Sequence, residues 1–193
     1  MSITVRELTL SETELVIDYF FNSTREYLDM MGVDPTRFTP PEEWRKGFRQ
    51  ELPLLPEERR VFLVSWLTDD EFIGFSTCDT IKFGEQANMH LHVTNPDLRQ
   101  KGIGSECVKR TVDVYFDRLK LKRLFCEPHA FNTAPNRALQ KAGFKYLKTY
   151  MTVPHRFNYR QAVNRWVIER QFSLRPIPTG ARFNLTENFG LLR

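Results

Sequence analysis

Apolar residues along the chain alternate between the two-residue period of strands and the three- to four-residue period of helices. A short strand is predicted over residues 3–8, followed at once by a helix that opens on a capping-box pattern at residues 11–14, Ser-Glu-Thr-Glu. The helical pattern continues over residues 24–31 and stops at Gly32. Residues 39–42, Thr-Pro-Pro-Glu, resemble a second capping box with proline in the first turn and open another helix.

The middle of the chain has the pattern of three antiparallel strands. Residues 61–67 and 71–81 are rich in β-branched and aromatic residues and are separated by a polar turn, which predicts a hairpin. A loop around Gly84 leads to a third strand over residues 88–94, which closes at Asn95-Pro96 because the residue before proline resists continuation.

The last part of the chain predicts helix, strand, helix and two strands. A helix over residues 105–119 is expected to bury one face, and a short strand over 121–127 follows. Asn132 is a favourable residue for the start of the next helix, which ends at Gly143. Strands are predicted over 144–153 and 162–170. The buried face of the first of these helices consists of Val108, Val112, Tyr115, Phe116 and Leu119.

Length and composition favour one α/β domain. A chain of 193 residues with 41% hydrophobic content can enclose one full core and is short for two, so we expect a domain over residues 1–170 and an irregular basic tail over 171–193. No apolar run reaches membrane-spanning length, and the first residues lack the features of a secretion signal, which favours a cytoplasmic protein. The three cysteines, Cys78, Cys107 and Cys126, are odd in number and are expected to be buried reduced thiols.

Residues 99–104, Arg-Gln-Lys-Gly-Ile-Gly, lie between a predicted strand and a predicted helix. Such a turn directs unpaired backbone N–H groups at one point at the positive end of a helix dipole, which is suited to bind phosphate. Gly102 and Gly104 would let an anion approach the main chain closely. The alternative is a turn that only eases entry into an amphipathic helix. A Walker loop is excluded because no Gly-Lys-Ser/Thr triplet occurs, and a dinucleotide fingerprint fails because Cys107 stands where a small residue is needed.

The order of elements and two motifs resemble the GNAT superfamily of acetyl-CoA-dependent N-acetyltransferases over roughly residues 3–170. The first motif, Arg/Gln-x-x-Gly-x-Gly/Ala, is matched by Arg99, Gly102 and Gly104. The second combines Cys126-Glu127-Pro128, Asn132 and residues 139–144, Leu-Gln-Lys-Ala-Gly-Phe. This stretch is similar to the branch that contains ribosomal-protein N-terminal acetyltransferases and aminoglycoside 6′-N-acetyltransferases.

The resemblance implies a mixed, mostly antiparallel, twisted sheet, splayed at its centre and covered by helices on both faces. Pantetheine would insert between the strands on either side of the glycine turn, the pyrophosphate would lie on the N–H groups of residues 100–105, and Asn132 would lie beside the pantetheine arm. Asn132 can equally be a plain helix cap. The implied cofactor-binding residues are Leu91, His92, Val93, Thr94, Arg99, Gln100, Lys101, Gly102, Ile103, Gly104, Ser105 and Asn132.

Acetyl transfer to an amine requires removal of a proton from the acceptor, and two residues are candidate catalytic bases. Strand alternation places His90, His92 and Thr94 on one face of their strand, and a histidine that faces a cleft titrates near neutral pH. His92 is nearer the expected splay, although it can instead be a hydrogen-bonded histidine beneath the first two helices. Glu127 matches the position of a catalytic glutamate in some N-terminal acetyltransferases of the superfamily, and can instead be a strand-end carboxylate paired with a cation.

One position departs from the pattern of several GNAT enzymes. A tyrosine seven residues after the asparagine protonates the leaving thiolate in those enzymes, and Leu139 occupies that position here. Leucine cannot donate a proton, so this general acid is absent. Tyr146, Tyr150 and Tyr159 are alternative donors that no motif supports.

Three other hypotheses start from different residues. His90-x-His92 places two imidazoles on one strand face, and a metal would need a third ligand from Cys126, Glu127 or His129. The fold can also serve as a CoA-binding or protein-interaction module without turnover. Nucleic-acid binding is disfavoured, because the net charge of +4 is mild and the basic residues near the expected cofactor helix can meet the 3′-phosphate of coenzyme A or solvent. These basic residues are Lys109, Arg110, Lys120, Lys122 and Arg123.

We therefore expect an enzyme that transfers acetyl from acetyl-CoA directly to a primary amine, either a peptide N-terminus or a small amine. The net positive charge disfavours polycationic aminoglycosides. The acceptor groove is expected between the first helices and the C-terminal strands, with Tyr27, Phe38, Trp44 and Tyr159 as candidate lining residues. The expected partners include no nucleic acid, membrane or metal, and a homodimer through the C-terminal strands or the tail is a further expectation.

Overall fold

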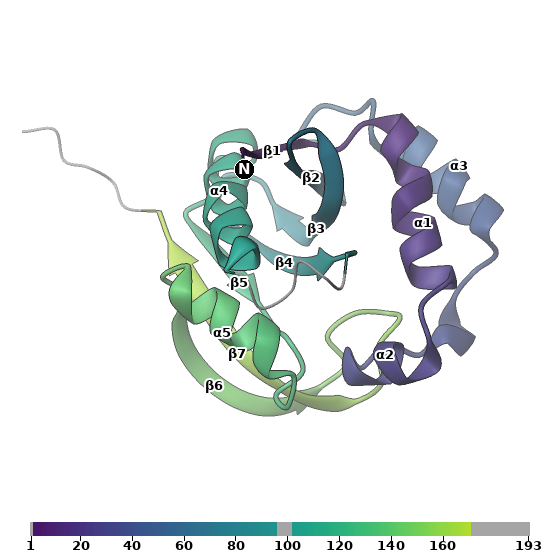
Figure 1. The fold of residues 1–193 in the computed structure, drawn as a ribbon. Coiled ribbons are helices and arrows are strands. Elements are labelled where there is room, and N and C mark those ends of the chain that lie inside the picture. The colour runs from purple at the N-terminus through teal and green to yellow at the C-terminus, as the bar shows by residue number, and fades with distance from the viewer. Residues whose placement is uncertain (1, 96–101, 171–193) are drawn as a thin grey trace, which may run out of the picture.

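The computed structural model describes residues 2–95 and 102–170, and its helices and strands follow in the order that the apolar pattern predicts (Figure 1). The predictions for Arg99, Gln100 and Lys101 and for the tail at 171–193 lie outside these residues. The elements are β1 (Ile3–Glu7), the 3₁₀ helix η1 (Leu10–Glu12), α1 (Thr13–Phe21), α2 (Arg25–Met30), the 3₁₀ helix η2 (Pro35–Arg37), α3 (Pro41–Glu51), β2 (Phe62–Thr68), β3 (Glu71–Lys82), β4 (Gln86–Val93), α4 (Ile103–Arg118), β5 (Arg123–Cys126), α5 (Thr133–Lys141), β6 (Lys145–Thr152) and β7 (Gln161–Glu169).

The described strands form one seven-stranded sheet in the order β1-β2-β3-β4-β5-β7-β6. Neighbouring strands are antiparallel except for β4 and β5, which are parallel and are connected through α4. This arrangement confirms the expected α/β fold with a mixed, mostly antiparallel sheet. Because parallel neighbours cannot be joined by a tight turn, the chain crosses over between β4 and β5, and the glycine turn falls at the start of that crossover.

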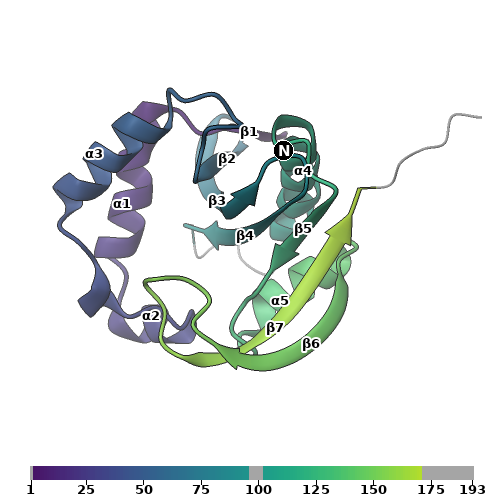
Figure 2. The same cartoon turned by 180° about the vertical axis from the view of Figure 1, so that it is seen from behind.

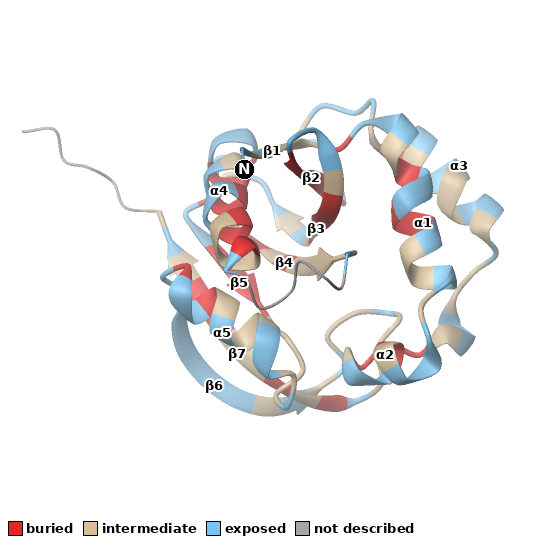
Figure 3. Ribbon diagram, in the orientation of Figure 1, coloured by how far each residue is buried: buried red, intermediate tan, exposed pale blue. Residues whose placement is uncertain are grey.

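Helices cover both faces of the sheet, with α1 and α3 on one side of the molecule and α4 and α5 on the other (Figures 1 and 2). The strand β2 is therefore buried along its whole length. Its alternate residues enter two cores: Phe62, Val64 and Trp66 join the larger one, and Leu63 joins a smaller one with Val16 of α1. Figure 3 shows buried residues concentrated in α4 and the central strands. Alternation along a doubly covered strand thus builds both cores.

The helix α4 buries the predicted face. Its five predicted core residues all lie in the larger core. Two hydrogen bonds fasten this face to the sheet: Tyr115 Oη donates to Ser76 Oγ over 2.9 Å, and Trp66 Nε1 donates to Thr111 Oγ1 over 2.7 Å. Polar groups inside the core are thereby satisfied, and the position of α4 against the sheet is fixed.

The helix starts differ from the two predicted capping boxes. The first capping box lies at Thr9 and Glu12, two residues before the predicted one, because the chain enters the 3₁₀ turn η1 before α1 begins. The helix α3 starts at Pro41, and its N-cap residue is Pro40, which makes no side-chain capping bond. The predicted helix ends are confirmed, since Gly32 and Gly143 follow α2 and α5 with φ values of +72° and +94°.

The sheet opens at its centre. Parallel pairing between β4 and β5 ends at Met89 and Cys126, whereas β4 continues to Val93 beside β3. The other half of the sheet continues as β7 and β6, whose connecting loop reaches back to the segment after α2. There Asp34 N donates to Phe157 O over 2.7 Å, and Tyr159 N donates to Gly32 O over 3.1 Å. These two hydrogen bonds connect the loop between β6 and β7 to the segment after α2, so the chain surrounds the opening.

Two expectations from composition concern membranes and thiols. No helix in the described ranges is long and apolar enough to cross a membrane. The three cysteines are free and buried, as predicted. Burial raises the pKa of the Cys107 thiol to about 12, so this sulfur stays protonated at neutral pH.

The Glu12 carboxylate connects β1, η1 and β2 through hydrogen bonds. Arg6 donates to both of its oxygens over 2.8 and 2.9 Å, and Thr9 N and Ser65 Oγ donate to Oε2 over 2.8 and 2.9 Å. Burial raises the pKa of Glu12, but these hydrogen bonds outweigh it and lower the pKa to about 2. Because this pKa is lower than that of an unfolded glutamate, the carboxylate stabilises the fold above about pH 4.5, and this contribution is lost as the pH falls towards 2.

We predict that Glu12→Gln lowers the free energy of unfolding by about 1–3 kcal/mol at pH 7, since it removes a charged acceptor of several hydrogen bonds. Urea titrations at pH 7, 5, 4 and 3 measure the difference from the unaltered protein, with the exposed Glu57→Gln as control. The difference should shrink below pH 4.5. A difference that stays constant to pH 3 would contradict this role of Glu12.

Candidate functional site

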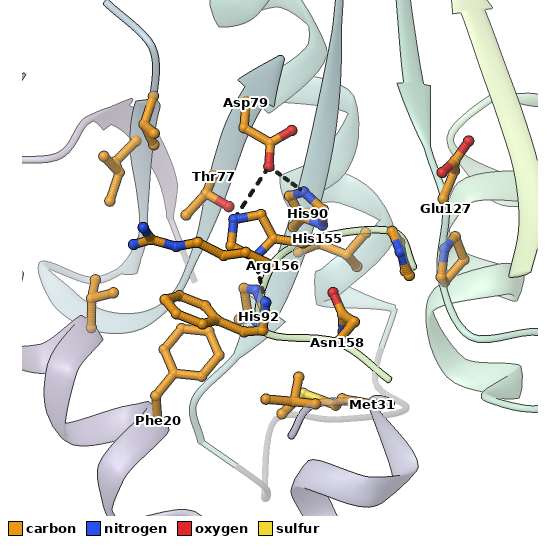
Figure 4. Close-up of a pocket in the computed structure, with 18 of the residues that line it drawn as sticks. Phe20, Met31, Thr77, Asp79, His90, His92, Glu127, His155, Arg156 and Asn158 are labelled. Atoms are coloured by element: carbon orange, nitrogen blue, oxygen red, sulfur yellow. Dashed lines mark hydrogen bonds and ion pairs between the residues drawn. The ribbon is translucent and has the colours of Figure 1, made fainter. Parts of the chain in front are cut away.

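A cavity of about 600 Å³ lies where the sheet opens (Figure 4). Its walls come from α1 and α3, from β3 and β4, from the segment after β5, and from the loop between β6 and β7. The predicted residues His92, Glu127 and Asn132 all line it, together with Leu91. The fold therefore brings both candidate bases and part of the predicted cofactor set to one place.

His92 lies in an aromatic environment on the cavity side of β4. Its ring stacks on Phe75, directly opposite on β3, with 4.7 Å between centroids, and Phe20 approaches edge-on. Its Nδ1 is 3.3 Å from Tyr19 Oη. Burial, followed by repulsion from His90, lowers the pKa of His92 to about 3. The imidazole is therefore neutral at physiological pH and can exchange hydrogen bonds without carrying charge.

His90, two residues earlier on the same face, has the opposite electrostatic environment. Its Nε2 lies 3.1 Å from Asp79 Oδ2 on β3, and His155 Nε2 lies 3.7 Å from the same oxygen (Figure 4). Burial lowers the pKa of His90, but the hydrogen bond to Asp79 and attraction to Asp79 and Glu127 outweigh it and raise the pKa. For His155, burial and repulsion by His90 lower the pKa to about 4. His90 is thus the histidine of this cluster that holds a proton most readily.

Glu127 follows β5 and is held by two donors. Arg165 Nη1 and Tyr150 Oη bind its Oε1 over 2.5 and 2.6 Å, and its side chain is only 8% exposed. In the described part of the chain, no side-chain hydrogen bond ends on Oε2. Tyr150, one of the predicted alternative donors, is therefore engaged with Glu127. Burial and this hydrogen bond raise the pKa of Tyr150.

Asn132 stands at the N-cap position of α5 but makes no side-chain capping bond. Its backbone carbonyl oxygen accepts a hydrogen bond of 2.7 Å from Asn136 Nδ2. Asn132 lines the cavity, and its side chain makes no hydrogen bond to another described residue. The predicted helix-capping role of the Asn132 side chain is therefore not observed.

The described part of the glycine turn starts α4. Gly102 is the N-cap residue, with φ of +80°, and a Cβ placed there would meet no described atom within 4 Å. At Gly104 a Cβ would meet only Val93 Cγ2, at 3.9 Å. Ser105 Oγ donates to Gly102 O over 2.8 Å, which fixes the first turn. The turn therefore presents bare main chain at the N-terminus of a 16-residue helix.

The remaining predicted residues are distributed between the core and the strand end. Leu91 and Val93 pack against the larger core, on the face opposite His90 and His92, as alternation predicts. Thr94 N donates to Ile73 O over 3.0 Å, so β4 stays attached to β3 beyond its last paired residue. Ile103 is buried in the same core beneath the first turn of α4. Leu139, which replaces the tyrosine of several GNAT enzymes, is fully buried there.

Of the predicted acceptor residues, Trp44 alone lines this cavity. Tyr27 Oη lies 3.0 Å from Tyr19 Oη, Phe38 packs edge-on against Phe20 and Trp44, and Tyr159 interacts with Arg25 and Asp29. The prediction for these three residues was wrong about their position in the cavity wall. The spacing of the helical residues fixed which face was apolar, but not which aromatic side chain would be innermost.

The structure adds residues that sequence reasoning missed, namely Asp79, His155, Phe157 and Arg165. Asp79 shares the face of Thr77 by strand alternation, which is a signal that the sequence contains. Its pairing with His90 depends on the register between β3 and β4, which includes an irregularity after Asp79. His155 and Phe157 come from a loop, and Arg165 comes from β7, so no local pattern connects them to the cavity.

The metal hypothesis finds no ligand set in the described ranges, where no group of three or more histidine, cysteine, aspartate or glutamate residues is arranged to hold an ion. Two of the basic residues considered for nucleic acid are engaged in ion pairs: Arg110 Nε with Glu106 over 2.9 Å, and Arg123 with Glu85 over 3.4 Å.

Comparisons with known proteins agree with this geometry. The family model described as acetyltransferase (GNAT) domain matches residues 2–145. No relative was found among the curated protein sequences. Among solved structures, the chain resembles RimL, a ribosomal L7/L12 α-N-protein acetyltransferase in complex with coenzyme A, with a TM-score of 0.69 and 16% identity over 88% of this chain and 94% of that one.

Two further solved structures share the fold. The aminoglycoside acetyltransferase AAC(6′)-Ib in complex with coenzyme A and kanamycin has a TM-score of 0.66 and 16% identity, over 88% of this chain and 95% of that one. The spermidine N-acetyltransferase from Vibrio cholerae in complex with CoA and spermine has a TM-score of 0.68 and 16% identity, over 86% of this chain and 95% of that one. At this identity the likeness establishes the fold, and the acceptors of those proteins differ from one another.

We predict that three of the four histidines that line the cavity, His90, His92 and His155, titrate separately. His92 and His155 should stay neutral down to about pH 4, whereas His90 should gain its proton above the ordinary histidine value of about 6.5, because of Asp79. NMR titration of the imidazole resonances measures all three, and Asp79→Asn should lower the pKa of His90. A titration in which His92 is protonated before His90 as the pH falls would contradict the structure.

Proposed function

The chain belongs to the GNAT family of acetyltransferases and is an N-acetyltransferase with acetyl-CoA as its acetyl donor, and we propose that transfer takes place where the cavity meets the opening between β4 and β5. One observation carries this proposal. The strands separate after Met89 and Cys126, and the candidate bases His92 and Glu127 lie on opposite sides of that separation, both lining the cavity. A donor inserted between the strands would face an acceptor in the cavity.

The described residues around the opening fit acetyl-CoA. Parallel pairing of β4 with β5 extends to Met89 and Cys126, and we propose that an extended pantetheine arm binds beyond this point, along residues 91–94 of β4. Gly102, where a Cβ would meet no described atom within 4 Å, and the first turn of α4, through Ile103, Gly104 and Ser105, suit a pyrophosphate. Asn132 would bind the arm from the other side, and Arg99, Gln100 and Lys101 remain predicted members of this site. When bound, acetyl-CoA supplies an activated acyl group.

Proton removal from the acceptor is assigned to residues at the same place. We propose Glu127 as a base because its Oε2 carries no side-chain hydrogen bond in the described part of the chain, while Arg165 and Tyr150 hold Oε1 in position. His92, neutral and weakly basic, is proposed to accept a hydrogen bond from the acceptor amine and orient it. The structure adds His90, whose proton affinity is raised by Asp79, as a third proton acceptor.

The acceptor is proposed to be a primary amine, either a peptide N-terminus or a small amine, because the cavity is of small-molecule size and open to the reacting end. Three free, buried cysteines suit a reducing compartment, and a cytoplasmic location is part of the proposal. A homodimer through the C-terminal strands is also proposed. β6 is an edge strand of the sheet, and it exposes Leu147 and Met151.

We predict that Gly102→Val abolishes saturable acetyl-CoA binding in calorimetric titration while leaving the fold intact, because its side chain would fill the space for the anion. Gly84→Val is a matched control: Gly84 also has positive φ, +74°, and open space around its Cβ, but it lies in the β3–β4 turn away from the cavity. Both variants carry the same backbone strain. Normal acetyl-CoA binding by Gly102→Val, or equal loss in both variants, would contradict the assignment.

Replacing the true base should lower kcat by about 10²-fold or more, with little change in acetyl-CoA affinity. Glu127→Gln, His92→Ala and His90→Gln are compared in steady-state assays that detect the released thiol, and calorimetry measures cofactor binding by each. We expect the largest loss for Glu127→Gln. Full turnover in all three variants would show that none of them removes the proton and that water or the substrate itself is the base.

A further inference from the structure

The cavity has two chemically different sides. The side next to the strand opening carries Asp79, His90 and Glu127, whereas α1 and α3 contribute mainly apolar residues, together with the carboxylates of Glu43 and Glu51 on α3. Figure 4 shows Phe20 on the opposite side of the pocket from Glu127. An acceptor whose amine reaches the opening must therefore direct the rest of its body towards α1 and α3.

Aromatic rings and aliphatic side chains form this apolar side. Trp44 stacks on Phe157 with centroids 5.0 Å apart and 8° between planes, and Phe20 lies 5.5 Å from Trp44. Val16, Val61 and Leu63 complete the surface, and Leu63 belongs to the smaller core. A surface of this kind gains free energy by removing an apolar group from water. Among the described residues it also contains one buried donor without a hydrogen-bond partner, Trp44 Nε1.

The charges around the cavity do not suit a polycation. Four carboxylates line it, but three already have donors: Asp79 has His90, Glu127 has Arg165, and Glu51 has the Arg60 side chain at 3.2 Å and Val61 N at 3.0 Å. Arg60 and Arg156 add two positive charges to the lining. An acceptor with several ammonium groups would find few free counter-charges here.

We propose that the acceptor is a primary monoamine with a single aromatic or branched apolar body, carried either by a small arylalkylamine or by a peptide whose N-terminal residue is apolar. This inference rests on the proposed function and specifies its acceptor. The amine lies beside Glu127 and His90, and the apolar body packs against Phe20 and Trp44. This orientation places the single positive charge of the acceptor beside Glu127 and His90, and it buries the apolar body against the aromatic rings.

The test compares kcat/KM for acetylation of a panel of amines, using thiol detection at fixed acetyl-CoA. The panel contains 2-phenylethylamine, a tripeptide with N-terminal phenylalanine, ethanolamine as a short polar monoamine, and the polycations spermidine and kanamycin. We expect the phenyl compounds to exceed ethanolamine by about 10- to 100-fold, the range typical of burying one apolar group. They should exceed both polycations. The ratio between phenylethylamine and the tripeptide identifies the source of the amine.

Two variants localise the effect. Trp44→Ala should lower kcat/KM for 2-phenylethylamine about tenfold relative to kcat/KM for ethanolamine. Phe83→Ala, which alters an exposed aromatic residue outside the cavity wall, is the control. Arg60→Ala avoids the core, since the Arg60 side chain is 85% exposed. It removes a cation from Glu51, and should raise kcat/KM for spermidine about threefold relative to 2-phenylethylamine. Thermal unfolding of each variant shows whether it is folded.

The possible results distinguish the proposed acceptor class from the proposed acetyltransferase function. Faster acetylation of spermidine or kanamycin than of the phenyl compounds would overturn the proposed acceptor class while leaving the acetyltransferase function in place. Equal use of ethanolamine and 2-phenylethylamine would overturn it as well. If acetyl-CoA binds and no amine of the panel is acetylated, the proposed acceptor class is wrong. If acetyl-CoA does not bind saturably, the proposed function is wrong.

Discussion

The architecture of the site depends on where hydrogen bonding between two parallel strands stops. β4 and β5 pair as far as Met89 and Cys126, and β4 then continues to Val93 beside β3. Main-chain N–H and C=O groups exposed by such an opening require partners, so an open strand side is suited to bind an extended ligand. The same separation creates the cavity and exposes both its strand-borne polar residues and the segment that carries Glu127.

Burial and pairing give neighbouring groups in this cavity different charges. His90 and His92 point to the same face of one strand, yet the pKa of His90 is raised by Asp79, and the pKa of His92 is lowered by burial among aromatic rings. Cations or backbone donors likewise hold most of the buried carboxylates. The strand end therefore combines groups that can accept a proton with neighbouring residues that carry little net charge. This arrangement suits the removal of one proton from the ammonium group of an acceptor.

Local patterns predict the elements of this fold well because each depends on nearby residues. The face of α4, the glycine-terminated helices and the alternation of β4 follow from spacing and from the backbone preferences of glycine. The candidate site was predicted in part: His92, Glu127 and Asn132 lie together, but the roles of the predicted site residues still await a test. The Asp79–His90 pair depends on strand register, and the His155 and Arg165 contacts join segments far apart in sequence. The first capping box lies at Thr9 and Glu12 rather than at the predicted Ser11 and Glu14, because the Glu12 carboxylate accepts hydrogen bonds from Thr9 N and Arg6.

The central claim is that acetyl-CoA occupies the opening between β4 and β5. Hydrogen–deuterium exchange of the full chain, with and without saturating acetyl-CoA, tests it directly by reporting on each backbone amide. We expect acetyl-CoA to slow amide exchange at residues 91–94 and 102–105, and to leave the exchange rates of the amides in β1 and in the edge strand β6 unchanged. Saturable binding without protection at residues 91–94 would contradict it, because the cofactor would then lie elsewhere on the molecule.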